Sequence, residues 1–169
     1  MIKGRAILLD TCVIQYSLSK EAQLREATGA FIAELLKNKN RLFVSDFTYY
    51  ELLKGANKDN KAKAEEKLNH FEEIPQTKDR LERATLLYSA YLGEESVKPV
   101  LSSISEIDAF IGSLIFNNSR PLLLTADFND FPRPFFKEVE VKPIEYEKGR
   151  GNKCTQYYYF LEANLELFR

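Results

Sequence analysis

Acidic residues beside the ends of apolar segments have the clearest potential for chemistry in this sequence. Asp10 ends the apolar run at residues 6–9, and Asp127 follows the run at 122–125 by two residues. Glu51 and Asp108 lie in segments with helical spacing that neighbour such runs. Ligands of an open parallel sheet bind beyond the carboxyl ends of its strands. We therefore expect these four acids to gather at one rim of a sheet.

A cluster of four carboxylates predicts a site for a divalent cation. Like charges a few ångströms apart repel each other unless a cation binds them or their pKa values rise. A set of oxygen ligands suits Mg²⁺ or Mn²⁺, whereas zinc favours His or Cys. The hydroxyls of Thr11 and Thr125, close to the same apolar runs, are candidates for orienting the acids or their waters. Asp130 is a further acid that can assist them.

Each acid also has a purely structural interpretation. Asp10 can cap the turn that follows a strand, and Glu51 can be a solvent-facing helix residue. Asp108 is the fourth residue of a Ser-x-x-Asp pattern, which is typical of a helix capping box. Asp127 and Asp130 can be ordinary turn residues. Only the ordered set of acids, taken together, favours a functional site.

The elements that must position these acids follow from the alternation of short apolar runs with longer helical patterns. Runs at 6–9, 42–44 and 121–125 predict buried strands, with short strands at 72–77 and 139–141, and helical spacing occurs at 21–38, 46–53, 57–73, 81–92 and 105–116. This order predicts a three-layer α/β/α domain with a central, mainly parallel sheet. The polar, basic loop at 147–153 then separates a domain at 1–146 from an aromatic C-terminal extension at 147–169. We expect the extension to pack on the domain or on a partner subunit.

Composition narrows the class of protein. The 169 residues are enough for one domain with a real core, and the net charge of −1 argues against a protein that coats nucleic acid. No apolar stretch approaches the roughly 18 residues of a membrane span. Cys12 and Cys154 form no disulfide framework, so we expect a cytoplasmic protein. The single histidine, His70, excludes catalysis by paired imidazoles.

Four segments, in this order, resemble the motifs of the PIN domain family, and they look closest to those of VapC toxins. The segments are LLDTCVI at 8–14, SDFTYYELLKG at 45–55, DAFIG at 108–112 and LTADFNDF at 124–131. Matching them to the family motifs LDTxV, ELLxG, DAxIxx and LxTxD/NxxDF selects Asp10, Thr11, Glu51, Gly55, Asp108, Thr125, Asp127 and Asp130. The match spans about residues 1–145 by motif order. VapC proteins commonly have Asn at the position of Cys12, and the aromatic tail lies outside the resemblance.

The resemblance implies an endoribonuclease that hydrolyses RNA phosphodiester bonds. Mg²⁺ or Mn²⁺ would be held by Asp10, Glu51, Asp108 and Asp127, and a water of lowered pKa would attack the phosphate. It also implies the toxin of a VapBC-type pair, with a small VapB-like antitoxin and a homodimer as partners. The apolar segment at 157–168 independently favours self-association.

Two alternatives remain at this point. A catalytically weak PIN-like module that binds RNA or protein is favoured by Cys12 and opposed by the intact acid set. A metal-dependent phosphatase would need an aspartyl nucleophile in a D-x-D pair, and Asp10-Thr11-Cys12 lacks the second Asp.

Overall fold

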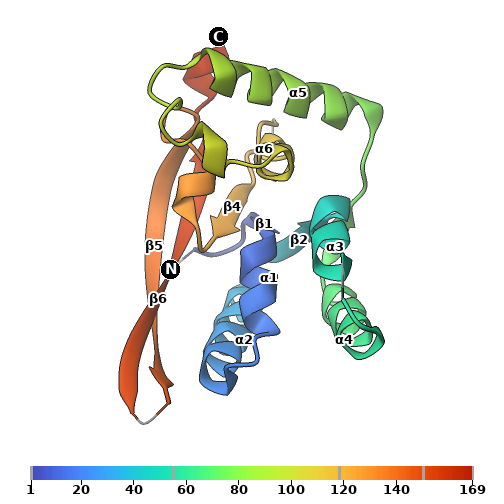
Figure 1. The fold of residues 1–169 in the computed structure, drawn as a ribbon, viewed down its shortest axis with the longest axis vertical. Helices are drawn as coiled ribbons and strands as arrows, with labels where there is room; N and C mark the ends of the chain where they lie inside the picture. Colours follow the sequence, from blue (N-terminus) through green and yellow to red (C-terminus); the bar gives the residue numbers. More distant parts are fainter. Residues whose placement is uncertain (1, 55, 118, 150, 169) are drawn as a thin grey trace.

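A mixed β-sheet forms the centre of the protein. The computed structural model describes residues 2–54, 56–117, 119–149 and 151–168. Within them the six strands lie in the order β3-β2-β1-β4-β6-β5 (Figure 1). The strands are β1 (Ala6–Leu9), β2 (Arg41–Ser45), β3 (Glu72–Ile74), β4 (Leu122–Thr125), β5 (Phe136–Lys148) and β6 (Asn152–Ala163). The helices are α1 (Thr11–Ser17), α2 (Ala22–Lys37), α3 (Asp46–Leu53), α4 (Lys58–Leu68), α5 (Lys78–Gly93) and α6 (Glu106–Ser113), with short 3₁₀ turns η1 (Leu101–Ser103), η2 (Phe128–Asp130) and η3 (Leu165–Phe168).

Strands β1 to β4 are parallel neighbours, and helices cover both of their faces. Ile7 and Leu9 of β1 pack with α1 and α2 on one face, whereas Leu8 packs with α5 and α6 on the other. This double burial explains why β1 and β4 are continuous apolar runs instead of alternating ones. The predicted three-layer α/β/α fold with a mainly parallel sheet is confirmed.

The helices beside the acids begin at side-chain caps. Ser45 accepts a hydrogen bond from the Thr48 amide and starts α3. Ser105 and Asp108 form the predicted capping box at the start of α6. The sequence also predicted that Gly55 ends α3; Gly55 lies outside the described residues, and the helix ends at Leu53.

The C-terminal segment forms part of the sheet. Strand β6 lies between β4 and β5 and is antiparallel to both, and Tyr158, Phe160 and Leu161 are completely buried in the core. The boundary expected at residue 147 therefore falls inside a long β5–β6 hairpin, whose far end extends past the other strands (Figure 1). The predicted strand at 139–141 was too short because charged residues alternate along β5 at the open edge of the sheet. The supposed linker contains the hairpin turn, where Gly149 and Gly151 have φ values of +62° and +83°.

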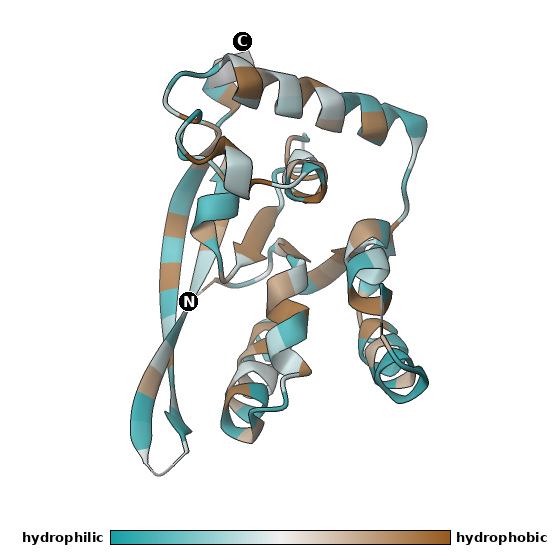
Figure 2. Ribbon diagram, viewed as in Figure 1, coloured by the Kyte–Doolittle hydropathy of each residue, from teal (hydrophilic) through white to brown (hydrophobic). Residues whose placement is uncertain are grey.

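Hydropathy follows the layers. In Figure 2 the central strand β4 is brown, whereas the outer end of α4 is teal. The charged helix α4 buries Ala64 and Leu68, as its sequence predicted. Leu86 of α5 was expected to be buried, but 66% of it is exposed because it lies on the outer side of the helix. In the described part of the chain, no helix is both long enough and apolar enough to cross a membrane.

Candidate active site

Asp10 is the buried centre of the acidic rim. It follows β1 and caps α1, and its backbone N–H donates to the carbonyl of Leu124 at 3.0 Å, which joins the ends of β1 and β4. One carboxylate oxygen accepts from the Thr11 amide at 2.7 Å. The other accepts from the hydroxyl of Thr125 at 2.7 Å and from the thiol of Cys12 at 2.9 Å. These donors fix the orientation of a side chain that is only 4% exposed.

Thr11 links Asp10 to the acid of the neighbouring helix. Its hydroxyl donates to Glu51 Oε2 at 2.5 Å, while its amide donates to Asp10. Glu51 lies in the last turn of α3, the helix that follows β2. The first two predicted acids are therefore joined through one residue, and the predicted supporting position of Thr11 has a direct geometric basis.

The remaining acids belong to the first turn of α6 and to the segment that follows β4. Asp108 uses one oxygen to accept from the Ser105 amide at 2.8 Å, in the capping box. Asp127 accepts from the Asn129 amide at 3.1 Å and donates its own N–H to the hydroxyl of Thr125 at 3.0 Å. Asp108 therefore does form a capping box, and Asp127 does stabilise a turn. Both roles are compatible with a position at the rim.

Asp130 is within electrostatic reach of the other acids. Burial raises the pKa of Asp130 to about 7, and further contributions come from the charges of Asp108, Asp127, Asp10 and Glu51. One carboxyl group therefore lies within electrostatic reach of all four predicted ligands. The expectation that these four acids form one cation site stays a prediction.

Burial also raises the pKa of Asp10, to about 6, and the charge of Asp108 adds to the effect. Hydrogen bonds from Cys12 and Thr125 act in the opposite direction. Desolvation raises the pKa of Asp108 as well, with a contribution from Asp127. Loss of water around the carboxylates is thus the main cause of these shifts, and the charges of neighbouring acids add to it.

Positive side chains of the described residues form no ion pair with the rim acids. The same part of the chain contains no group of three or more His, Cys, Asp or Glu side chains already close enough to hold one ion. Carboxylate and hydroxyl oxygens are nevertheless the donor types that Mg²⁺ prefers, and Mg²⁺ commonly keeps several waters while it contacts one or two carboxylates.

Cys12 has a larger part in this site than the sequence indicated. Its thiol accepts a hydrogen bond from the Ala126 amide at 3.2 Å while it donates to Asp10. It thereby connects the first turn of α1 to the end of β4. Burial, and next the charge of Asp10, raise the pKa of the thiol well above its usual value, which agrees with the prediction that Cys12 is not a nucleophile.

The fold and this rim define an α/β protein with an acidic site beyond the carboxyl ends of its parallel strands. A model of the PIN domain family matches residues 7–135, a span that contains the five rim acids, and the chain belongs to the PIN domain family. No curated protein is significantly similar to the sequence. Among solved structures, the chain is similar to one in the crystal structure of VapBC2 from Rickettsia felis bound to a DNA fragment from their promoter. The identity is 22%, the match covers 65% of this chain and 80% of that one, and the TM-score is 0.47. PIN domains are generally nucleases.

Proposed function

We propose that this protein is a metal-dependent endoribonuclease that hydrolyses RNA phosphodiester bonds. The observation that supports this proposal best is the set of acids within electrostatic reach of Asp130, namely Asp10, Glu51, Asp108 and Asp127, none of which forms an ion pair with another described residue. Membership of the PIN domain family supports a nuclease. A bound cation would offset the repulsion among the acids and favour their charged forms.

Asp10, Glu51, Asp108 and Asp127 are the residues that would hold Mg²⁺ or Mn²⁺. When bound, the cation supplies positive charge to the phosphodiester and lowers the pKa of an attacking water. The chain itself supplies orientation. Thr125 and Cys12 fix one oxygen of Asp10, and Thr11 fixes Glu51. Asp130, whose pKa is about 7, holds a proton more readily than an ordinary aspartate and so reduces repulsion at the rim.

Cleavage of a labelled RNA that contains single-stranded and hairpin segments tests the proposal. We expect cutting with Mg²⁺ or Mn²⁺ and none with chelator. Asp10→Asn or Asp108→Asn should reduce the rate by on the order of 100-fold or more, because each removes charge at nearly constant volume. Asp59→Asn, the same change at an exposed acid of α4, should cut like the parent.

Equal rates for the parent and both rim variants would place the activity elsewhere. A parent that binds the RNA but never cuts it would support the alternative, a catalytically weak PIN-like binding module. Cys12 remains the feature of the sequence that favours this alternative, although its thiol does donate to Asp10.

We propose further that the enzyme is the toxin of a VapBC-type pair in the cytoplasm. The sequence motifs support this assignment, and a rim of unpaired carboxylates is a suitable target for a basic side chain of a VapB-like antitoxin. Co-expression with a VapB-like antitoxin should abolish cleavage and relieve any growth arrest. Full cleavage activity in the co-purified complex would contradict the assignment.

A homodimer also belongs to this proposal, but its basis changes. The tail that suggested it is buried in the chain's own core, because Tyr158 and Phe160 are completely covered. Exposed leucines on α5, namely Leu81, Leu86 and Leu92, support self-association instead. Sedimentation of the parent and of Leu86→Lys tests this: a dimer that dissociates in the variant is expected, and a monomeric parent contradicts it.

A further inference from the structure

A surface hollow lies beside the acidic rim, and none of the rim acids is among its lining residues. It has a volume of about 540 Å³ and begins at Phe128, the residue directly after Asp127. One wall comes from the segment after α5, with Ser96 and Val100, and the other from the segment after β4, with Pro132 and Arg133. The volume lies within the range of about 300–1,000 Å³ that is usual for small-ligand sites.

The chemistry of the second wall is aromatic and cationic. The ring of Phe128 packs against the ring of Tyr159 in β6, with 5.5 Å between centroids and 34° between planes. The guanidinium of Arg133 lies 5.4 Å from the centre of the Phe128 ring. Arg133 is exposed and takes part in none of the ion pairs that join described residues. Bases of single-stranded RNA stack on aromatic rings and on guanidinium planes of this kind.

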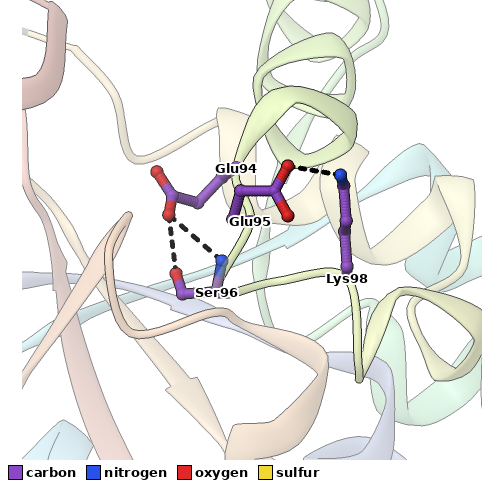
Figure 3. Close-up of polar contacts among 4 residues, drawn as sticks. All are labelled: Glu94, Glu95, Ser96 and Lys98. Carbon is purple, nitrogen blue, oxygen red and sulfur yellow. Dashed lines mark hydrogen bonds and ion pairs between the residues drawn. The ribbon is translucent and has the colours of Figure 1, made fainter.

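Both walls are fixed by their own hydrogen bonds. The carbonyl of Pro132 accepts from the amides of Phe135 and Phe136 at 2.9 and 3.1 Å. On the other wall, Glu94 Oε1 accepts from the amide and the hydroxyl of Ser96, at 3.2 and 2.8 Å (Figure 3). The hollow is therefore formed before any ligand arrives, which reduces the entropy cost of binding.

We propose that this hollow binds one nucleobase of a single-stranded RNA, next to the phosphodiester at the acidic rim. The inference rests on the proposed function, since it assigns a base subsite to the same substrate. The base lies between the Arg133–Phe128 layer and the apolar side chain of Val100, which is 39% exposed. An RNA must approach a rim that repels it, and Arg133 supplies positive charge within six residues of Asp127. Stacking of this kind accepts any base, so the subsite sets the position of the strand more than its sequence.

Binding of a fluorescent single-stranded RNA, measured by anisotropy in chelator so that no cutting occurs, tests the proposal. Arg133→Gln should weaken binding by on the order of 10-fold, within the range of one base stack. Arg25→Gln, at an exposed arginine of α2 on the opposite face of the sheet, is the matched control and should bind like the parent. Arg133→Lys keeps the charge but loses the plane, so it should retain the salt dependence of binding and still lose affinity.

Oligonucleotides with one base removed at successive positions identify the base concerned. At one position, loss of the base should weaken binding to the parent by on the order of 10-fold, and it should cause little further loss in Arg133→Gln. If the effects of base removal and of Arg133→Gln are additive at every position, Arg133 contacts a phosphate and no base. That result would overturn the base subsite. Unchanged RNA binding in Arg133→Gln would also overturn the base subsite. A protein segment would then be the better candidate for the ligand of the hollow.

The binding measurements in chelator are independent of the nuclease assay. If the parent cuts no RNA with Mg²⁺, the proposed function fails, although coupling between Arg133 and one base can still be measured in chelator. If the parent cuts RNA but the coupling is absent, only the subsite fails. Thermal unfolding of each variant excludes a loss of binding through loss of folded protein.

Discussion

At the scale of single residues, the site depends on how Asp10 is kept charged while it is buried. Transfer of a carboxylate out of water is costly unless hydrogen bonds replace the lost water. Thr125 and Cys12 both donate to Asp10 Oδ2, and the Thr11 amide donates to the other oxygen. The sequence identified Thr11 and Thr125 as supporting residues, because their hydroxyls neighbour the acids. It did not identify the hydrogen bond from the Ala126 amide to Cys12, because that bond exists only once β1 and β4 are adjacent.

Cys12 should therefore contribute to stability through its hydrogen bonds. Cys12→Ala removes a donor to Asp10 and leaves the Ala126 amide without its acceptor. We expect a loss of about 1–3 kcal/mol in the free energy of unfolding, measured with urea in chelator. Cys12→Ser retains a donor and an acceptor and should lose less. An alanine variant as stable as the parent would show that neither bond contributes to folding.

The raised pKa of Asp10 predicts a pH dependence of stability. Its carboxyl titrates near its usual value of 3.8 when unfolded and at about 6 when folded. Between these values the folded protein binds more protons than the unfolded chain, so stability falls as pH rises through this window. The free energy of unfolding is measured in chelator for the parent and for Asp10→Asn. From pH 3.5 to pH 7, the value for the parent should fall by about 3 kcal/mol relative to that for the variant. A difference that does not change with pH would mean that Asp10 titrates normally in the folded protein.

At the scale of elements, the prediction succeeded where sequence patterns are local and failed where pairing is distant. Continuous apolar runs identified β1 and β4, and a cap pattern identified the start of α6. The β5–β6 hairpin was missed because its outer strand alternates charged residues and its turn resembles a linker. Its burial depends on β6 entering the sheet beside β4, which no local pattern records.

The close approach of α6 to the start of β5 gives a prediction for this scale. A Cβ added at Gly112 would lie 2.7 Å from Cζ of Phe136. That ring is 1% exposed and packs edge-on against Phe131, with 5.4 Å between centroids, so it has no free space to move into. Gly112→Ala should cost about 1–3 kcal/mol of unfolding free energy in urea.

Gly29→Ala in α2 is the matched control for this substitution. No atom lies within 4 Å of a Cβ added there, so the variant should gain about 0.5–1 kcal/mol from helix propensity. A Gly112→Ala variant that is stabilised to the same extent would show that α6 and β5 do not pack this closely.

At the scale of the whole molecule, two apolar cores hold the sheet from both sides and force the acids together at its rim. Folding therefore brings carboxylates close to one another, and their repulsion opposes the burial of apolar side chains. An ion that binds only the folded rim relieves this repulsion and stabilises the entire domain. The unpaired acids thus connect the stability of the protein to the ion that the proposed chemistry requires.

Thermal unfolding with increasing Mg²⁺ tests this connection without any measurement of nuclease activity. At a concentration about 100 times the dissociation constant, binding to the folded state alone adds about 2.7 kcal/mol, so the melting temperature should rise with Mg²⁺. The rise should shrink at pH 5, because protons compete with the cation for Asp10 and Asp130, whose pKa values are about 6 and 7. Asp10→Asn should lose most of the effect, and Asp59→Asn should keep it. Equal stabilisation of both variants would mean that Mg²⁺ acts through general ionic strength, and the rim would then have no demonstrated affinity for the cation.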